Sequence, residues 1–522
     1  MSFVRDLDTR LLRLSQGDYF TLRDACQGVQ VFGGIGSGKT SGSGKALASA
    51  YLRAGMGGLV LAAKPDEIEL WQSYARENGR ANSVLLFGDR GGCFNFLTYE
   101  LNRHGADGIG SVVECLMRIL EAARLSKGDG GKAEPFWEDA TRQLLRNSIP
   151  ILYAATGTVS IPDIIRFVSS APISTDQLQT ADWQSSSFMF QAMLAAKDRP
   201  VARLSADDFM KTSNYWRYEF AQLDGKTRGN IAISLSTALD RFNRGRLHRA
   251  FCGETSLVPE LTLHGAIIIM DMSALTWNED GIIGQQLFKY MWQRAVLARN
   301  ALEPRHRERP VFLWADEAQY FVNGFDAEYQ STCRSSRACT VYLTQSLPTY
   351  YARMGGPQPQ HAADMLLANF QTRIFHNNAC AVTNRWASDT IGRSMQVRYN
   401  ESSGSSSGYS TGMNAGENAS WGSSQGSGGS SDSRGGSSSS WNSGSNRGGG
   451  DNWGRNRGRN SGQSNSAGFS ETMDVEIEPA VFARDLATGG PANGGRVPGL
   501  WLSAGRRFTE SRRNYLHVTF QQ

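Results

Sequence analysis

Short apolar runs alternate with segments of helical spacing along much of the chain. Runs of this length, about four to eight residues, are typical of strands that are buried on both faces, as in a parallel sheet. Apolar positions between them recur every three or four residues, which predicts helices such as residues 45–52 and 284–299. The pattern therefore predicts an α/β fold. The runs that we predict to be strands are residues 29–32, 57–64, 83–87, 266–271, 310–317, 340–345 and 372–375.

A long helical stretch interrupts this alternation between residues 97 and 205. Leu116 and Leu120, for example, lie four positions apart on one predicted helical face. Phe136 and Trp137 open another helix, and we expect these aromatic rings to lie in a core rather than to line a ligand site. The sequence thus predicts a mostly helical domain inserted into the sheet domain.

The apolar pattern stops at about residue 401, and Ser, Gly and Asn dominate as far as residue 470. This composition buries too little apolar surface to offset the entropy of ordering, so we predict a disordered linker. The alternative is loose contact with single-stranded nucleic acid or with a partner surface, through interspersed tryptophans and arginines. These residues are Trp421, Trp441, Trp453, Arg447, Arg455, Arg457 and Arg459. A short helix from residue 478 and strands at 500–502 and 515–520 are predicted to follow.

One glycine-rich segment lies between a predicted strand and a predicted helix. It reads G-G-I-G-S-G-K-T and fits G-x-x-x-x-G-K-[ST], the pattern of a phosphate-binding P-loop. Glycines let backbone N–H groups approach phosphate oxygens, the lysine adds positive charge, and the threonine hydroxyl ligates Mg²⁺. The chain has 57 glycines, so a chance match is the alternative, but the strand–loop–helix setting argues against it. The residues assigned to phosphate binding are Gly33, Gly34, Gly36, Ser37, Gly38, Lys39 and Thr40.

Two acids, Asp316 and Glu317, end the apolar strand at 310–317. In an ATPase built on a P-loop, an Asp at this position holds Mg²⁺ and the following Glu activates the attacking water as a general base. The alternative is an exposed acidic strand end. Gln345 ends the next predicted strand, where it either senses the γ-phosphate or is an ordinary core amide.

Arginines between these positions are candidates for a role between subunits. Ring ATPases commonly complete each site with an arginine of the neighbouring subunit, and Arg334 and Arg337 are the candidates, with surface salt bridges as the alternative. Lys64, at the end of another strand, either contacts phosphate or the DNA backbone or is a solvated lysine. The seven histidines show no metal-ligand spacing, so we assign them no role.

Length and composition limit the remaining possibilities. With 522 residues, two or three domains are expected, and the net charge of +5 is too small to indicate a broad basic surface. None of the seven cysteines forms a C-x-x-C pair, so we expect reduced, mostly buried thiols. No apolar run reaches the roughly 18–20 residues that span a bilayer. We therefore expect a cytoplasmic protein, with a partner providing any attachment to the inner membrane.

The segments give a predicted division of the chain. The nucleotide-binding domain comprises residues 1–96 and 206–400, and the helical domain, residues 97–205, is inserted between them. The disordered linker occupies residues 401–470, and residues 471–522 return to the motor domain as strands.

The order of these motifs resembles the TraD/TraG-like coupling proteins of type IV secretion, a family of conjugative ATPases. Residues 64–67 look like part of the family's D-P-K-G-E stretch, and residues 93–97 look like its F-N-P-L. The strand at 313–319 resembles its Walker B segment, and residues 505–520 look like its closing strands. Arg334 and Gln345 match the spacing of the family's R…Q-S pattern, which favours Arg334 over Arg337; Arg373 stays a third candidate.

The chain also departs from the family pattern. The family usually has N-terminal transmembrane helices, which this sequence lacks. Lys64 stands where D-P-K-G-E has its Asp, and Phe96 replaces the Pro of F-N-P-L. No family role is therefore carried over to Lys64.

The resemblance implies a RecA-like motor domain with an inserted all-α domain, assembled as a hexameric ring around a DNA channel. It implies ATP and Mg²⁺ as cofactors. As partners it implies DNA with its relaxase or other substrate proteins, and a secretion-channel or membrane-anchor subunit. We expect an ATP-hydrolysing motor that recruits and translocates DNA. The alternatives are an ATP-dependent receptor for protein substrates and an NTP-dependent switch or scaffold in a mobile-element or defence system.

Overall fold

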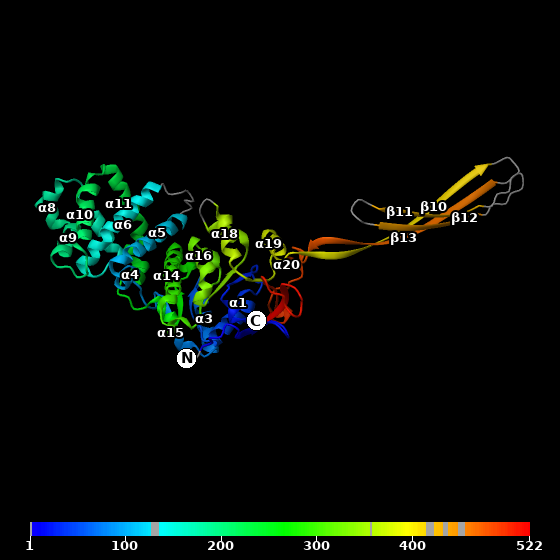
Figure 1. The fold of residues 1–522 in the computed structure, drawn as a ribbon, viewed down its shortest axis with the longest axis horizontal. Coiled ribbons are helices and arrows are strands. Elements are labelled where there is room, and N and C mark those ends of the chain that lie inside the picture. The colour runs from blue at the N-terminus through cyan, green and yellow to red at the C-terminus, as the bar shows by residue number, and fades with distance from the viewer. Residues whose placement is uncertain (1–2, 127–134, 355–357, 414–421, 432–436, 447–454) are drawn as a thin grey trace. The chain divides into compact units, whose positions relative to one another are not determined.

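The computed structural model describes residues 3–126, 135–354, 358–413, 422–431, 437–446 and 455–522 (Figure 1). The chain divides into two compact units. The first comprises Met1–Ala387 and Pro479–Gln522, and the second comprises Ser388–Glu478.

A nine-stranded sheet forms the centre of the first unit, in the order β15-β14-β9-β3-β8-β7-β4-β6-β5. All neighbours from β9 to β5 are parallel, whereas β14 is antiparallel to β9 and to β15. The parallel strands coincide with the predicted apolar runs, which confirms the α/β fold class. Their bounds are β3 (Val29–Phe32), β4 (Gly57–Leu61), β5 (Val84–Gly88), β6 (Ile267–Asp271), β7 (Val311–Ala315), β8 (Ala338–Thr344) and β9 (Thr372–Phe375), and the C-terminal strands are β14 (Arg496–Ser503) and β15 (Tyr515–Gln521).

Helices cover both faces of this sheet. On one face, Trp71 of α3 (Asp66–Glu77) stacks on Phe312 of β7 at 5.5 Å between ring centroids. Helix α2 (Lys45–Arg53), which follows the P-loop, belongs to the same core. On the other face, Phe288 of α14 (Glu279–Ala298) lies 4.6 Å from Phe87 of β5, again between centroids. Because successive strand residues point to opposite faces, strands covered in this way are apolar throughout.

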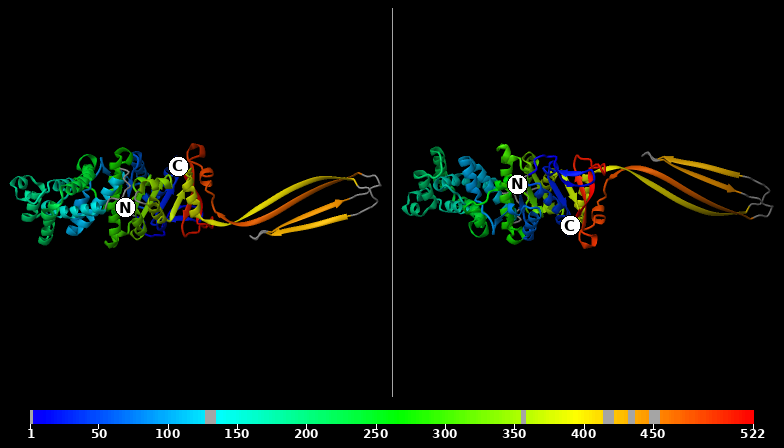
Figure 2. Two further views of the ribbon diagram at one scale, coloured as in Figure 1. Left: turned by 90° about the horizontal axis from the view of Figure 1, so that it is seen from above. Right: turned by 90° about the horizontal axis from the view of Figure 1, so that it is seen from below.

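The helical region is longer than predicted. Helices α5 (Ile109–Ser126), α6 (Pro135–Thr156), α7 (Ile161–Ser169) and α9 (Phe188–Asp198) are followed, beyond the expected boundary at residue 205, by α10 (Ala206–Asn214) and α11 (Gly225–Asn243). The latter two pack on α6 and α7, so the sheet resumes only at β6. Apolar spacing identifies a helix but not the layer on which it packs, which explains the misplaced boundary. Figures 1 and 2 show this group, coloured cyan to green, apart from the C-terminal strands.

Two expectations about this helical group are also resolved. Phe136 is 55% exposed, so the prediction of a core position is wrong for it. Among the described residues, no single helix is long and apolar enough to cross a membrane; residues 136–156 and 161–169 pass that test together only as a pair bent by 111°.

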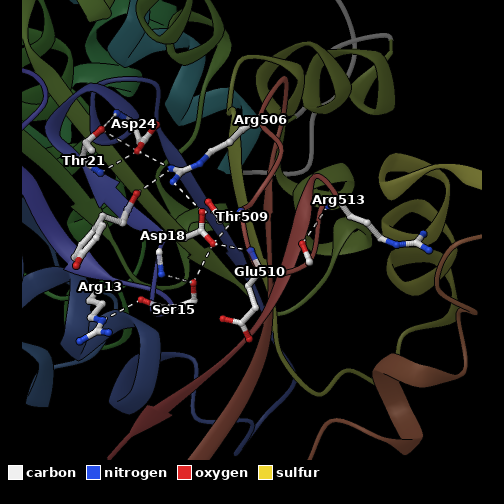
Figure 3. Close-up of polar contacts among 12 residues, drawn as sticks. Arg13, Ser15, Asp18, Thr21, Asp24, Arg506, Thr509, Glu510 and Arg513 are labelled. Atoms are coloured by element: carbon white, nitrogen blue, oxygen red, sulfur yellow. Dashed lines mark hydrogen bonds and ion pairs between the residues drawn. The ribbon is translucent and has the colours of Figure 1, made fainter.

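The N-terminal hairpin, β1 (Arg10–Arg13) and β2 (Tyr19–Thr21), is locked to the loop between β14 and β15 (Figure 3). The buried carboxylate of Asp18 accepts hydrogen bonds from the backbone N–H of Thr509 at 2.9 and 3.1 Å. Arg506 donates to the carbonyl of Tyr19 at 2.9 Å and to Asp24 at 3.2 Å. The two ends of the first unit therefore form one polar joint.

The second unit differs from the predicted disordered linker at 401–470. Its strands β10 (Arg393–Met413) and β13 (Arg455–Val475) pair antiparallel, as do β11 (Gly422–Ser431) and β12 (Ser437–Asn446). A ladder uses backbone groups, which Ser and Gly supply without any apolar side chain, although such sequences specify register weakly. Of the predicted contact residues, Trp421, Arg447 and Trp453 lie outside the described residues.

Candidate nucleotide-binding site

The predicted site residues meet at one edge of the sheet. The P-loop follows β3, Gln345 follows β8, and Asp316 follows β7, and these three strands are neighbours. Parallel strands bring all their carboxyl ends to the same edge, which is where open α/β sheets bind ligands. The fold thus brings the P-loop close to strand ends that lie about 300 residues away in the sequence.

The P-loop forms an open cradle. Gly36 and Gly38 have φ angles of 71° and 82°, a left-handed conformation that glycine adopts without strain. A Cβ atom at Gly36 would meet nothing within 4 Å, so space remains where a ligand would lie. The hydroxyl of Ser37 is buried and has no hydrogen-bond partner among the described residues. An unpartnered donor inside a glycine-rich loop fits a phosphate oxygen.

A π-helical turn, Thr40–Gly44, links the loop to α2. The backbone N–H of Gly44 donates to the carbonyl of Lys39 at 2.8 Å, which is a bond between residues five apart. Single π-turns of this kind occur frequently at functional sites. Here the turn fixes the backbone on which Lys39 and Thr40 stand.

Two contacts join the P-loop to the strand end of β7. The ammonium of Lys39 lies 3.3 Å from Oε1 of Glu317, and both side chains are buried. The hydroxyl of Thr40 donates to Oδ2 of Asp316 at 2.6 Å. A hydroxyl beside a carboxylate provides the oxygen ligands that Mg²⁺ takes together with nucleotide phosphates. The residues present therefore fit a Mg–nucleotide complex.

Glu317 is the centre of a polar network. Its Oε1 also accepts from Gln345 Nε2 at 3.2 Å, and its Oε2 accepts from Gln319 Nε2 at 2.8 Å. Its backbone is left-handed, with φ 52°, which is unusual for a glutamate and is typical of strained functional positions. Burial alone would raise the pKa of Glu317, but the charge of Lys39 and the amide hydrogen bonds outweigh it and lower the pKa. The carboxylate is therefore held ionised.

Glu67 is a buried acid at this edge to which the sequence analysis gave no role. It is 6% exposed, and its Oε2 accepts from the backbone N–H of Ala63 at 2.8 Å, whereas Oε1 has no hydrogen-bond partner in the part of the chain that the structure describes. Burial and, to a lesser extent, the charge of Asp316 raise the pKa of Glu67 to about 8. The sequence signal for a role of Glu67 was its position shortly after the strand β4, because β4 neighbours β7, the strand that precedes Asp316. Nearby Lys64 is half-exposed and lies 4.0 Å from Glu317.

The structure separates the three candidate arginines. Arg334 is exposed and precedes β8, at the edge opposite Gln345, so it does not reach the P-loop of its own chain. Arg337 donates to the backbone carbonyls of Arg5 and Glu308, and buried Arg373 donates to the carbonyl of Leu367. Both of the latter have structural partners, so Arg334 stays the candidate for action between subunits.

Metal and cysteine chemistry of other kinds is not indicated. Among the described residues, no group of three or more His, Cys, Asp or Glu side chains forms a metal cluster. The seven cysteines are free thiols, and Cys26, Cys115, Cys333 and Cys339 are buried. A Mg²⁺ site needs no such cluster, because phosphates and water supply most of its ligands.

Comparisons with known proteins concern a segment of the chain and its fold. Residues 310–447 match the family model described as the TraM recognition site of TraD and TraG. No curated protein matches the sequence.

Solved structures of the plasmid coupling protein TrwB share the fold. The complex with ADP and Mg²⁺ has a TM-score of 0.53 at 12% identity, and the alignment covers 99% of this chain and 90% of that one. The complex with the non-hydrolysable GTP analogue GDPNP has a TM-score of 0.52 at 13% identity, with the same coverage. The matched segment and the shared fold agree with the resemblance of this sequence to the TraD/TraG-like coupling proteins of type IV secretion.

Proposed function

We propose that this protein is an ATP-hydrolysing motor that recruits and translocates DNA, in the form of a single strand with a bound relaxase. The observation that supports this most is the joined set of P-loop and strand-end residues: Lys39 on Glu317, Thr40 on Asp316, and Gln345 on Glu317. Relatives in fold bind nucleotides, since TrwB has been solved with ADP and Mg²⁺ and with ATP and GTP analogues.

The contact between Lys39 and Glu317 suggests how hydrolysis is controlled. Lys39 neutralises the carboxylate of Glu317, which would act as the general base. A bound triphosphate supplies the bond to be cleaved and stronger anionic partners for Lys39. Lys39 then leaves Oε1 of Glu317, which becomes able to orient water and accept its proton. Gln345, on the same oxygen, senses this exchange.

Asp316 and Thr40 would hold Mg²⁺ in this account. Their 2.6 Å hydrogen bond holds the two oxygen atoms close together, which supports this role. The Asp316 carboxylate also accepts from the backbone N–H of Glu317 at 2.9 Å, which fixes its orientation. A pre-oriented hydroxyl and carboxylate reduce the entropy lost when the metal binds.

The position of Arg334 supports a ring. In a head-to-tail assembly, the edge that carries Arg334 on one subunit faces the P-loop edge of the next, so each site is completed in trans. A hexamer is the assembly that we propose, in the cytoplasm and attached to the inner membrane through a partner. The segment 310–447 is proposed to recognise a relaxosome protein, as its family model's description suggests.

A receptor for protein substrates is the second candidate function. It is favoured by the same family match, because its description concerns recognition of a protein rather than of DNA. In this case hydrolysis would drive release or unfolding of the bound protein.

Steady-state ATP hydrolysis with and without single- and double-stranded DNA tests these proposals. The wild type is compared with Lys39→Ala, which removes the positive charge that would contact the nucleotide phosphates. The motor predicts a Lys39-dependent rate that DNA raises several-fold. A Lys39-dependent rate that ignores DNA favours the receptor, and turnover no greater than that of the variant favours an NTP-dependent switch.

A further inference from the structure

His376 contacts the turn that follows the P-loop, and the sequence analysis gave it no role. It directly follows β9 and is completely buried. One ring nitrogen, Nε2, lies 2.7 Å from the hydroxyl of Ser43 in the π-turn after the P-loop. The other, Nδ1, lies 3.0 Å from the backbone carbonyl of Pro498 in β14. One imidazole therefore bridges the nucleotide site and the C-terminal strand.

The chemistry of these partners fixes the tautomer. The Pro498 carbonyl can only accept, so Nδ1 carries the proton. In the neutral ring Nε2 then accepts from the Ser43 hydroxyl at 2.7 Å, the shorter of that hydroxyl's two contacts, since the Lys39 carbonyl lies 3.2 Å from it. The pKa of His376 is lowered to about 4. Burial and the charge of Lys39 lower this pKa, and the hydrogen bond to the Pro498 carbonyl raises it by a smaller amount. The ring is therefore neutral at physiological pH, and both of its hydrogen bonds are directional.

The surrounding backbone is shaped to admit this ring. A Cβ atom at Gly499 of β14 would lie 2.9 Å from Cε1 of His376, and one at Gly33 of the P-loop would lie 3.1 Å from its Cβ. Both distances are shorter than normal van der Waals contact. The His376 side chain thus lies between two glycines, with its Cβ atom against Gly33 and its ring against Gly499.

Other contacts seat the P-loop on the same C-terminal strands. A Cβ atom at Gly38 would lie only 2.6 Å from Cγ2 of Val497 in β14. Val497 also packs against Gly42. The side-chain amide of Gln522, after β15, donates to the hydroxyl of Ser41 at 2.6 Å. Glycine at position 38 is therefore required both by its positive φ and by the C-terminal strand.

We propose that His376 is a positioning residue of the nucleotide site, which fixes the P-loop turn to β14 and makes the C-terminal hairpin, β14 and β15, a structural part of that site. The inference deepens the proposed function and rests on it where nucleotide binding is the readout. Residues 388–478 separate β9 from β14 in the sequence, so the chain passes through the second unit before it forms the strand that packs against the P-loop.

The first test needs no nucleotide. Hydrogen exchange of the backbone amides of residues 34–44 is compared between wild type and His376→Asn, in which the amide replaces Nδ1 but does not reach Ser43. We expect these amides to exchange at least about tenfold faster in the variant, while amides of β7 and β8 do not change. Ser43→Ala should have the same effect, and the double variant should add nothing. Unchanged exchange in both single variants would overturn the proposal, whatever the protein binds.

The second test uses a fluorescent ATP analogue in an equilibrium titration. We expect His376→Asn to raise Kd about tenfold, and His376→Gln, whose amide reaches toward Ser43, to recover most of the affinity. His361→Ala, an exposed histidine on α18 (Pro359–Ala368), is the matched control and should bind as wild type. If Lys39→Ala abolishes binding but both His376 variants bind as wild type, the positioning role is wrong and the proposed function stands. If the wild type itself binds no nucleotide, the proposed function fails, and the exchange measurement decides on His376.

Discussion

Glu317 and Glu67 show how neighbouring carboxylates acquire different states from their surroundings. Both oxygens of Glu317 accept hydrogen bonds, and Lys39 compensates its charge. Glu67 has one bonded oxygen and no cation at bonding distance among its described contacts. An ionised acid and a largely protonated acid therefore stand at one sheet edge, and this difference leads to opposite predictions.

Replacing Glu317 by Gln should separate binding from hydrolysis. The amide keeps the size of the side chain but cannot accept a proton, so we expect the hydrolysis rate to fall at least about a hundredfold. Nucleotide affinity should be retained, because Lys39 loses its competing carboxylate. Single-turnover hydrolysis and nucleotide titration measure the two effects. A rate within tenfold of wild type would assign the base to another group, with Glu67 the first to examine.

Replacing Glu67 by Gln should change how stability depends on pH. Because the folded pKa is raised from an ordinary value of 4.5 to about 8, the folded state binds more protons between those values. The free energy of unfolding contributed by this group is therefore present below pH 4.5 and is lost as the pH rises to 8. We expect the variant to lose that decline, as measured by urea unfolding at pH 5, 6.5 and 8. Parallel pH profiles for variant and wild type would contradict the assignment.

At the scale of elements, a buried ion pair holds the segment after the Asp316–Glu317 strand end in place. Lys289 of α14 bonds to Asp326 of α16 (Gly324–Thr332), and both are at most 1% exposed. Asp326 also accepts from the phenol of Tyr342 in β8 at 2.9 Å and from Gln293 at 2.8 Å. The network thus ties two helices to β8, the strand that precedes Gln345.

Breaking this pair on one side should cost more stability than removing it. Asp326→Asn leaves Lys289 buried without its counter-charge, and we expect a loss of about 3–5 kcal/mol in the free energy of unfolding. Lys289→Met together with Asp326→Asn should lose clearly less, because no buried charge remains. Urea unfolding of both variants measures the difference. Equal losses would show that the charge is not the source of the stability.

The sequence predicted elements well where one local pattern decides the structure. Apolar runs gave the parallel strands, and glycine spacing gave the P-loop. It failed where partners are distant: His376 acquires its role from Ser43 and Pro498, which lie 333 and 122 residues away. Likewise, the ends of β4 and β7 place Glu67 beside Asp316, which no local pattern reveals. Helices α10 and α11 lie in residues 206–400, which were assigned to the nucleotide-binding domain, but they pack on α6 and α7.

At the scale of the whole molecule, we propose that the two edges of the sheet carry complementary halves of a catalytic site. The P-loop edge has the proposed metal-binding and base residues, and the opposite edge carries exposed Arg334. A single chain cannot bring the two together around its own sheet. The proposed ring resolves this by placing them on neighbouring subunits.

Mixing two inactive variants should restore activity in such a ring. Lys39→Ala lacks the P-loop lysine but keeps Arg334, whereas Arg334→Ala lacks the arginine but keeps Lys39. In an equal mixture, about a quarter of the sites combine an intact Lys39 with an intact Arg334 from the neighbour, so we expect about a quarter of the wild-type hydrolysis rate. Arg337→Ala mixed with Lys39→Ala serves as the control. A mixture as inactive as either variant alone would remove Arg334 from the site.

Displacement of streptavidin from single-stranded DNA biotinylated at one end tests the motor claim most directly. We predict displacement that requires ATP, is faster from one end than from the other, and disappears in both Lys39→Ala and Glu317→Gln. A wild-type protein that hydrolyses ATP at a DNA-dependent rate but releases streptavidin from neither end would contradict translocation.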